Sequence, residues 1–320
     1  MYHVYFASCV PAGGICHYLM QEDGSFTFCD KILCDRPMYQ IIDDGSMYIL
    51  LRQPFPSDSE SGLISCRIMP DGSLSNVSGA APTGGIVACH LCMFKGNVYM
   101  VNYLSGSISS SAGKIVYHTG HGPNPGRQEA PHTHMITPTP DGKDLMCTDL
   151  GIDCIFIYDE NLNEISCAKA PAGSGPRHLA VLDSGHVACV NELSCTVDIY
   201  AFGDGKLSFM FSQPLVPALS DTSKGAAIRV KRDIIYISVR GNDTVTVFRW
   251  HDNRLEQCQC IPCGGKSPRD ILVVGNILLC MNESSSTVTA FSLDKNGLLE
   301  RKLPGDLHIE SVLCAASISG

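Results

Sequence analysis

The sequence predicts an all-β fold, a single seven-bladed β-propeller domain that spans residues 1–320. Three observations lead to it: short β-rich segments recur at a period of roughly 40 to 50 residues, turns separate them throughout, and no helical crossover between parallel strands can be placed. The 320 residues, 44% of them hydrophobic, suffice for two ordinary domains or one large all-β domain. The repetition favours a single ring.

Six segments share a turn, a short β-rich strand and a polar loop. They are "GSMYILLRQP", "GNVYMVNYLSG", "GKDLMCTDLGID", "GHVACVNELSC", "RDIIYISVRGND" and "GNILLCMNESSS". We take their equivalent positions as Leu51, Asn102, Asp149, Asn191, Arg240 and Asn282. Successive positions are 51, 47, 42, 49 and 42 residues apart, which is the length expected of one four-stranded propeller blade.

A further strand precedes most of these segments and an alternating strand follows most of them. The preceding strands open with "DRPMYQI", "VACHLCM", "APHTHMI", "SGPRHLA", "KGAAIRV" and "KSPRDIL". Six complete units result, and "YHVYFAS" near the start and "IESVLCAA" near the end remain. We expect these two segments to share a seventh blade, because closing the ring removes exposed sheet edges.

Charge and composition argue against several classes of function. The chain has 23 basic and 32 acidic residues and a net charge of −9, which disfavours nucleic acid or an anionic membrane as a partner. The N-terminal segment lacks the basic start and apolar core of a signal peptide, so we expect a cytoplasmic protein. A small anionic substrate stays possible if arginine, lysine or histidine side chains gather locally.

The 17 cysteines lie mostly in apolar runs such as "VACHLCM" and "LLCMN". In a reducing compartment we expect them to be small core residues. The spacings in "CHLC" and "CQCIPC" are similar to those of zinc knuckles, but the two segments belong to repeats far apart around the ring. The sequence therefore predicts no metal site.

Two histidines at the start of a predicted strand stand out. His132 and His134 are two residues apart, so their side chains should project to the same face. Counting back from Asp141 and Asp183 in the following turns places His134 level with Arg177 of the next repeat. The same slot of the inner strand thus holds a polar side chain in neighbouring blades, where a packed core would hold Val or Leu. We expect this slot to face the channel.

More polar residues follow the next strand of each unit. Glu192 and Arg240 occupy the loop after it in successive repeats, beside Asn191 and Asn242. One rim of the channel would then collect two histidines, up to three arginines and a carboxylate. A single histidine is more simply explained as a structural hydrogen-bonding group, whereas a convergent cluster favours a functional site.

The sequence resembles the seven-bladed propeller lactonases, a family that includes propeller-type 6-phosphogluconolactonases and 3-carboxymuconate lactonizing enzymes. The resemblance rests on the stretches that begin "NPGRQEAPHTHMI", "GSGPRHLAV", "GAAIRVKRD" and "GKSPRDILV", and it covers residues 124–292 closely. It implies cytoplasmic hydrolysis of a sugar lactone without a metal or another cofactor. The first repeats match less well, because "DRPMYQI" and "VACHLCM" lack the Pro-His or Gly-Pro-Arg start.

The resemblance also implies which residues act. By motif position the candidate catalytic residues are His132, His134, Arg177, Glu192 and Arg240. The candidate substrate-binding residues are Arg269, Glu283 and Asn191. Arg269 and Glu283 hold positions equivalent to those of Arg177 and Glu192 in a later repeat.

Opening a lactone requires a base that takes a proton from water and hydrogen-bond donors where the oxyanion forms. Glu192 or a neutral histidine can be the base, and the sequence leaves the choice open, although nearby arginines would weaken a carboxylate base. Arginine binds a phosphate or carboxylate through two parallel hydrogen bonds. The expected substrate is a small anionic sugar lactone, foremost the 6-phosphogluconolactone of the pentose phosphate pathway.

Two alternatives stay open at this point. A cycloisomerase that forms a lactone from a carboxymuconate would use the same arginines on carboxylates, and a propeller can also be a binding platform without catalysis. Arg127 and Glu129 are expected first to order their Gly/Pro-rich loop as a pair, and second to contact substrate. We expect a monomer or a weak homodimer.

Overall fold

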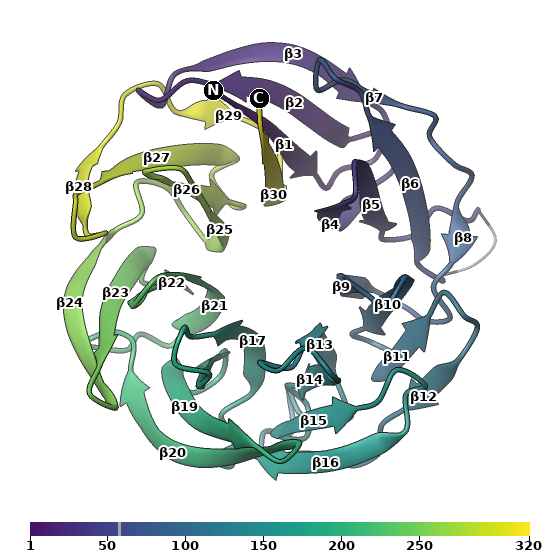
Figure 1. Ribbon diagram of the computed structural model, residues 1–320, viewed down its shortest axis with the longest axis vertical. Coiled ribbons are helices and arrows are strands. Elements are labelled where there is room, and N and C mark those ends of the chain that lie inside the picture. The colour runs from purple at the N-terminus through teal and green to yellow at the C-terminus, as the bar shows by residue number, and fades with distance from the viewer. Residues whose placement is uncertain (57–58) are drawn as a thin grey trace.

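The computed structural model describes residues 1–56 and 59–320, whose strands form seven antiparallel sheets arranged in a ring around a common centre (Figure 1). The predicted all-β, seven-bladed propeller is thereby confirmed. We number the blades by the chain order of their innermost strands, so that β4 begins blade 1 and β30 is the innermost strand of blade 7. No helix long and apolar enough to cross a membrane occurs among the described residues.

The strands of blades 1 to 3 follow the chain from the channel outwards. Blade 1 consists of β4 (Pro37–Asp43), β5 (Ser46–Leu51), β6 (Gly62–Ile68), β7 (Leu74–Ser75) and β8 (Ala81–Pro82). Blade 2 consists of β9 (Ala88–Phe94), β10 (Asn97–Asn102), β11 (Ser107–Ser110) and β12 (Ile115–Tyr117). Blade 3 consists of β13 (Thr133–Pro138), β14 (Leu145–Asp149), β15 (Cys154–Tyr158) and β16 (Glu164–Lys169).

Blades 4 to 6 repeat this order. Blade 4 consists of β17 (Pro176–Val181), β18 (Val187–Asn191), β19 (Thr196–Gly203) and β20 (Lys206–Pro214). Blade 5 consists of β21 (Lys224–Lys231), β22 (Ile234–Arg240), β23 (Thr244–His251) and β24 (Arg254–Pro262). Blade 6 consists of β25 (Pro268–Val274), β26 (Ile277–Asn282), β27 (Thr287–Leu293), β28 (Leu299–Lys302) and β29 (Leu307–His308).

Both ends of the chain build blade 7, as the sequence predicts. The strand nearest the channel is β30 (Val312–Ser319), followed outwards by β1 (Tyr2–Ser8), β2 (Gly14–Met20) and β3 (Phe26–Ile32) (Figure 1). In the closing pair, Tyr5 lies opposite Ala316. The ring is therefore closed by the hydrogen bonds between β1 and β30.

Side chains between the blades form the core. In one cluster Val190 and Val197 of blade 4 pack with Ile228 and Ile237 of blade 5, and all four are at most 1% exposed. The outermost strands carry alternating exposed residues, as β16 illustrates, because only one of their faces meets a neighbouring blade. Burial between successive sheets thus holds the ring together.

The cysteines are largely part of this core. Eleven of the 17 are buried, and all 17, which lie within the described residues, are free thiols. Cys147, Cys189 and Cys280 are each 0% exposed on the second strands of their blades. They occupy positions between sheets where a small apolar side chain fits.

A β-bulge near the start of the inner strands sets the direction of the channel-facing side chains. The register shifts between Thr133 and Met135 in blade 3 and between Pro176 and His178 in blade 4. A bulge places two residues opposite one, so consecutive side chains are no longer sent to opposite faces. As a result Arg177 and His178 both reach the channel.

The strand pairing confirms one predicted equivalence. Thr133 pairs with Asp149 in blade 3, and Pro176 pairs with Asn191 in blade 4. The residue after each pair, His134 or Arg177, therefore occupies the same slot.

The pairing also corrects one position of the repeat alignment. Gly225 pairs with Val239 in blade 5, so Val239, and not Arg240, is equivalent to Asn191. Arg240 lies one residue further and matches Glu192. The two were misaligned because β22 extends one residue further than β18 before its loop.

Candidate active site

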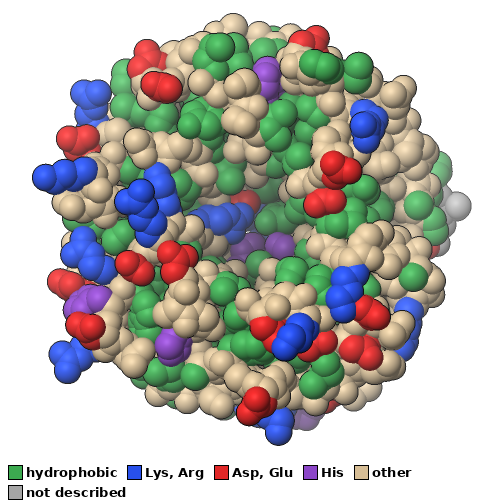
Figure 2. Space-filling view, viewed as in Figure 1, with side chains coloured by type: hydrophobic (Ala, Val, Ile, Leu, Met, Phe, Trp, Pro, Cys, Tyr) green, Lys and Arg blue, Asp and Glu red, His purple; other side chains and the backbone are tan. Residues whose placement is uncertain are grey.

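A cavity of about 370 Å³ opens at one mouth of the channel, where the second strand of each blade ends. Its charged lining consists of one carboxylate and six cations: Glu192, and Arg52, Arg127, Arg177, Lys224, Arg240 and Arg269. Figure 2 shows charged and histidine side chains lying in the hollow at the centre of the ring. A protein of net charge −9 thus concentrates positive charge at one point. Such a cavity favours anions.

Three of the predicted residues come from the same slot of different blades. His134, Arg177 and Arg269 each follow the first paired residue of an inner strand, in blades 3, 4 and 6. All three line the cavity. The repeat of the fold therefore aims side chains from separate repeats at one small volume.

Glu192 is the centre of the charged network. Its carboxylate, 6% exposed, accepts hydrogen bonds from Arg127 Nη2 at 2.5 Å, Arg177 Nε at 3.1 Å and Arg240 Nη2 at 2.7 Å. Burial alone would raise the pKa of Glu192, but the positive charges of Arg240, Arg177 and Arg127 hold that pKa well below its usual value. A carboxylate stabilised in this way stays ionised and is a weak base.

His134 has a different environment. The side chain is buried, and its ring lies edge-on to Tyr103 at 5.7 Å and to His178 at 5.1 Å between ring centroids. Among the described residues, its Nδ1 atom has no hydrogen-bond partner. Burial, followed by repulsion from Arg177, lowers the pKa of His134 well below its usual value. The imidazole is therefore neutral at neutral pH and able to accept a proton.

Hydrogen bonds to its neighbours hold Arg177 in one orientation. It is 2% exposed, and its Nη1 donates to the backbone oxygen of Ala226 at 2.7 Å, in addition to the bond from Nε to Glu192. Burial and the nearby Arg240 lower its pKa to about 9, so the guanidinium stays protonated at neutral pH. A fixed, buried donor of this kind can stabilise negative charge that develops on a substrate.

Arg240 and Arg269 complete the arginine set. The Nε atom of Arg240 is buried without a partner among the described residues, while its Nη2 donates to Glu192. Arg269 donates to Glu283 at 3.2 Å. Glu283 is not among the residues that line the cavity, and it contacts the cavity through its pair with Arg269.

Two other predicted residues also lie outside the cavity lining. His132 stacks on Tyr103 with ring centroids 4.5 Å apart, and its nitrogens contact the Tyr103 backbone oxygen at 3.0 Å and Glu129 at 3.3 Å. It precedes the bulge, so the geometry makes it a support for Tyr103. Asn191, 0% exposed, donates to Thr196 at 2.9 Å within its own blade. Its place in the strand pairing, one residue before Glu192, leaves it behind the cavity wall.

Sequence reasoning missed part of the cavity. Arg127 reaches Glu192 and the Tyr103 hydroxyl instead of forming the expected loop-ordering pair, and Glu129 pairs with His132. The proline- and glycine-rich loop gave no signal that its arginine turns inward. Lys224, which pairs across the strands with Arg240, was also not predicted.

Below the cavity the channel is filled by a second polar layer. Arg229 donates to Asp270 at 2.7 Å, and the ring of His90 lies 4.3 Å from that of Tyr39. His178 connects this layer to His134 through the ring contact above. This layer forms the floor of the site. Among the described residues, no cluster of three or more His, Cys, Asp or Glu side chains is arranged to hold a metal ion.

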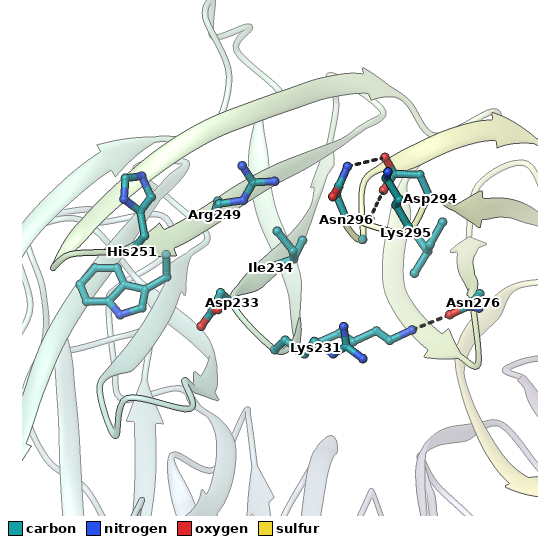
Figure 3. A pocket seen from close by; sticks show the side chains of 13 residues that line it. Lys231, Asp233, Ile234, Arg249, His251, Asn276, Asp294, Lys295 and Asn296 are labelled. Carbon is teal, nitrogen blue, oxygen red and sulfur yellow. Dashed lines mark hydrogen bonds between the residues drawn. The ribbon is translucent and has the colours of Figure 1, made fainter.

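A larger groove of about 750 Å³ lies between blades 5 and 6, at the opposite ends of the strands (Figure 3). Its polar groups are engaged in local structure. Lys231 donates to Asn276 at 3.0 Å, and Asp294 accepts from Asn296 within one turn (Figure 3). These contacts stabilise turns, and among the described residues no carboxylate of this groove is bonded to several arginines as Glu192 is.

Fold and cavity together define a propeller with a polar site at its channel mouth. The family model described as "Lactonase, 7-bladed beta-propeller" matches residues 3–315. The chain therefore belongs to the lactonase family of seven-bladed β-propellers.

Several known proteins are similar to the chain. Uncharacterised proteins of Staphylococcus aureus are 36% identical over 181 residues, a match that spans 53% of the chain and 53% of their own length. Solved structures agree over nearly the whole ring. A periplasmic gluconolactonase of Pseudomonas aeruginosa has a TM-score of 0.89 at 20% identity, with 99% of both chains covered. A Lactobacillus plantarum protein has a TM-score of 0.90 at 23% identity, with 100% of both chains covered.

Proposed function

We propose that the protein hydrolyses a small anionic sugar lactone, foremost 6-phosphogluconolactone, at the mouth of the channel. One observation carries the proposal: a buried histidine, whose Nδ1 has no partner among the described residues, and several arginines fixed by ion pairs line the same cavity. Membership of the lactonase family supports the reaction type. The excess of cations over carboxylates supports a negatively charged substrate.

The reaction begins with a water molecule that attacks the lactone carbonyl carbon. His134 accepts a proton from this water, because its imidazole is uncharged. Arg177 and Arg269 donate hydrogen bonds to the oxyanion that forms on the carbonyl oxygen. The tetrahedral intermediate then breaks its bond to the ring oxygen, and this oxygen takes the proton back from His134. The product is the open-chain acid.

Glu192 has a positioning role in this mechanism. Three arginines surround its carboxylate, which makes proton acceptance unfavourable. The same three bonds fix the directions of the guanidinium groups. Between the two candidate bases that the sequence leaves open we choose His134, because the Glu192 carboxylate is occupied by three arginines whereas His134 Nδ1 has no hydrogen-bond partner among the described residues.

The direct test is ring opening of 6-phosphogluconolactone, measured above the spontaneous rate. His134→Asn should lower kcat by about a hundredfold or more, because it removes the base. His251→Asn is the matched control, since His251 is exposed and lines the opposite groove. Absence of acceleration by the wild-type protein at micromolar concentration would eliminate the proposal, and ring closure of carboxymuconate, assayed in parallel, would then favour the cycloisomerase.

The pH dependence of kcat/KM gives an independent prediction. The neutral form of His134 is the active one and its pKa is lowered, so activity should persist below the ordinary histidine pKa of about 6.5. We expect kcat/KM, corrected for spontaneous opening, to be level from about pH 8 down to about pH 6. A fall of activity centred near the ordinary histidine value would contradict this assignment of the base.

A further inference from the structure

Two cations of the cavity, Lys224 and Arg52, form no ion pair with a described residue, and of these only Lys224 is half-buried. Glu192 accepts bonds from Arg127, Arg177 and Arg240, and Glu283 pairs with Arg269. The ion pairs recorded between described residues include none for Lys224, although its side chain lines the cavity.

The surroundings of Lys224 make this ammonium group electrostatically unfavourable. It is half-buried, and burial, followed by repulsion from Arg127, lowers its pKa. Attraction to Glu192 offsets part of this effect, whereas Arg240, directly across the strands, adds to the repulsion. Arg52, the other cation without a recorded ion pair to a described residue, is exposed and stays hydrated. An anion bound beside Lys224 would relieve this repulsion.

The position of Lys224 along its strand separates it from the reacting groups. In blade 5, Ala226 occupies the slot that Arg177 occupies in blade 4. Each of the two directly follows the inner-strand residue that pairs with the equivalent position of the second strand of its blade. Lys224 precedes Ala226 by two residues, which is about 6 to 7 Å along a strand toward the rim. A group bound there lies at the far end of a substrate whose carbonyl carbon meets Arg177 and His134.

We propose that Lys224, together with Arg127 and Arg240, binds the phosphate at the far end of the lactone and makes the enzyme selective for phosphorylated substrates. The inference rests on the proposed function and specifies its substrate class. The compact ammonium group suits a phosphate as a point charge, while the two arginines add directed donors at the edge of the Glu192 network.

The first measurement compares kcat/KM for 6-phosphogluconolactone and for unphosphorylated glucono-δ-lactone. In Lys224→Met, the ratio of the two values should fall by about tenfold to a hundredfold, the effect of losing one charge-assisted hydrogen bond. Lys224→Arg should restore most of the ratio. Lys295→Met, in the opposite groove, is the control and should leave it unchanged. An unchanged ratio in Lys224→Met would overturn the inference and leave the proposed lactonase activity standing.

The second measurement does not depend on catalysis. Calorimetric titration should show that wild-type protein binds 6-phosphogluconate about tenfold or more tightly than gluconate, and that Lys224→Met removes the difference. If neither lactone is hydrolysed but this pattern appears, the phosphate site stands and the proposed reaction fails. Equal affinity of wild-type protein for both acids would overturn the phosphate site.

Discussion

Replacing Arg177 by Met is expected to lower kcat for lactone hydrolysis by about a hundredfold or more, the usual cost of losing one fixed oxyanion donor. Arg177 suits this role because it is 2% exposed and its donors to Glu192 and Ala226 fix the orientation of the guanidinium group. Arg177→Lys should recover only part of the rate, because an ammonium group cannot reproduce the planar fork. Steady-state kinetics with 6-phosphogluconolactone gives the answer.

The matched control for this experiment is Arg249→Met, which changes an arginine of the groove between blades 5 and 6. Its kcat should stay within about twofold of wild type, since surface substitutions have small effects. A kcat for Arg177→Met within about threefold of wild type, in protein that unfolds at the wild-type urea concentration, would remove Arg177 from the mechanism.

Replacing Glu192 by Gln should destabilise the fold by about 3 kcal/mol, because it leaves a nearly inaccessible Arg177 without its counter-ion. The folded-state pKa of Glu192 is depressed, so its contribution to stability is present above the unfolded-state pKa of about 4.3 and is lost as the pH falls through the folded value. Urea unfolding of wild type and Glu192→Gln at neutral pH measures the difference.

Glu283→Gln provides the comparison for Glu192→Gln. The side chains of its pair with Arg269 are 26% and 30% exposed, so water screens the charges and the loss should stay below about 1 kcal/mol. Equal free energies of unfolding for the two variants would show that the network around Glu192 contributes nothing special to stability.

The fold could be predicted from the sequence because every blade repeats the same local pattern. The polar residues that end successive strands indicate the length of the repeat. The two segments left unmatched near the termini indicate that β1 and β30 close the ring. One error arose at Arg240, where an extra residue of β22 shifts the alignment by one. A shift of one residue alters which side chain faces the channel, but the spacing of the repeats does not reveal it.

The site was predictable only where it follows the repeat. His134, Arg177 and Arg269 share one slot of the fold, so their convergence follows from the periodicity. Arg127 comes from an irregular loop, whose path no periodic pattern describes. For a similar reason His132 was placed with His134, because simple strand alternation does not anticipate the bulge between Thr133 and Met135.

The decisive experiment is a crystal structure of the protein soaked with 6-phosphogluconate. We expect the acid to lie in the cavity at the channel mouth, with its carboxylate against Arg177 and His134 and its phosphate against Lys224. An acid bound only in the groove between blades 5 and 6, or a cavity that stays free of it at saturating concentration, would show that the proposed site is wrong.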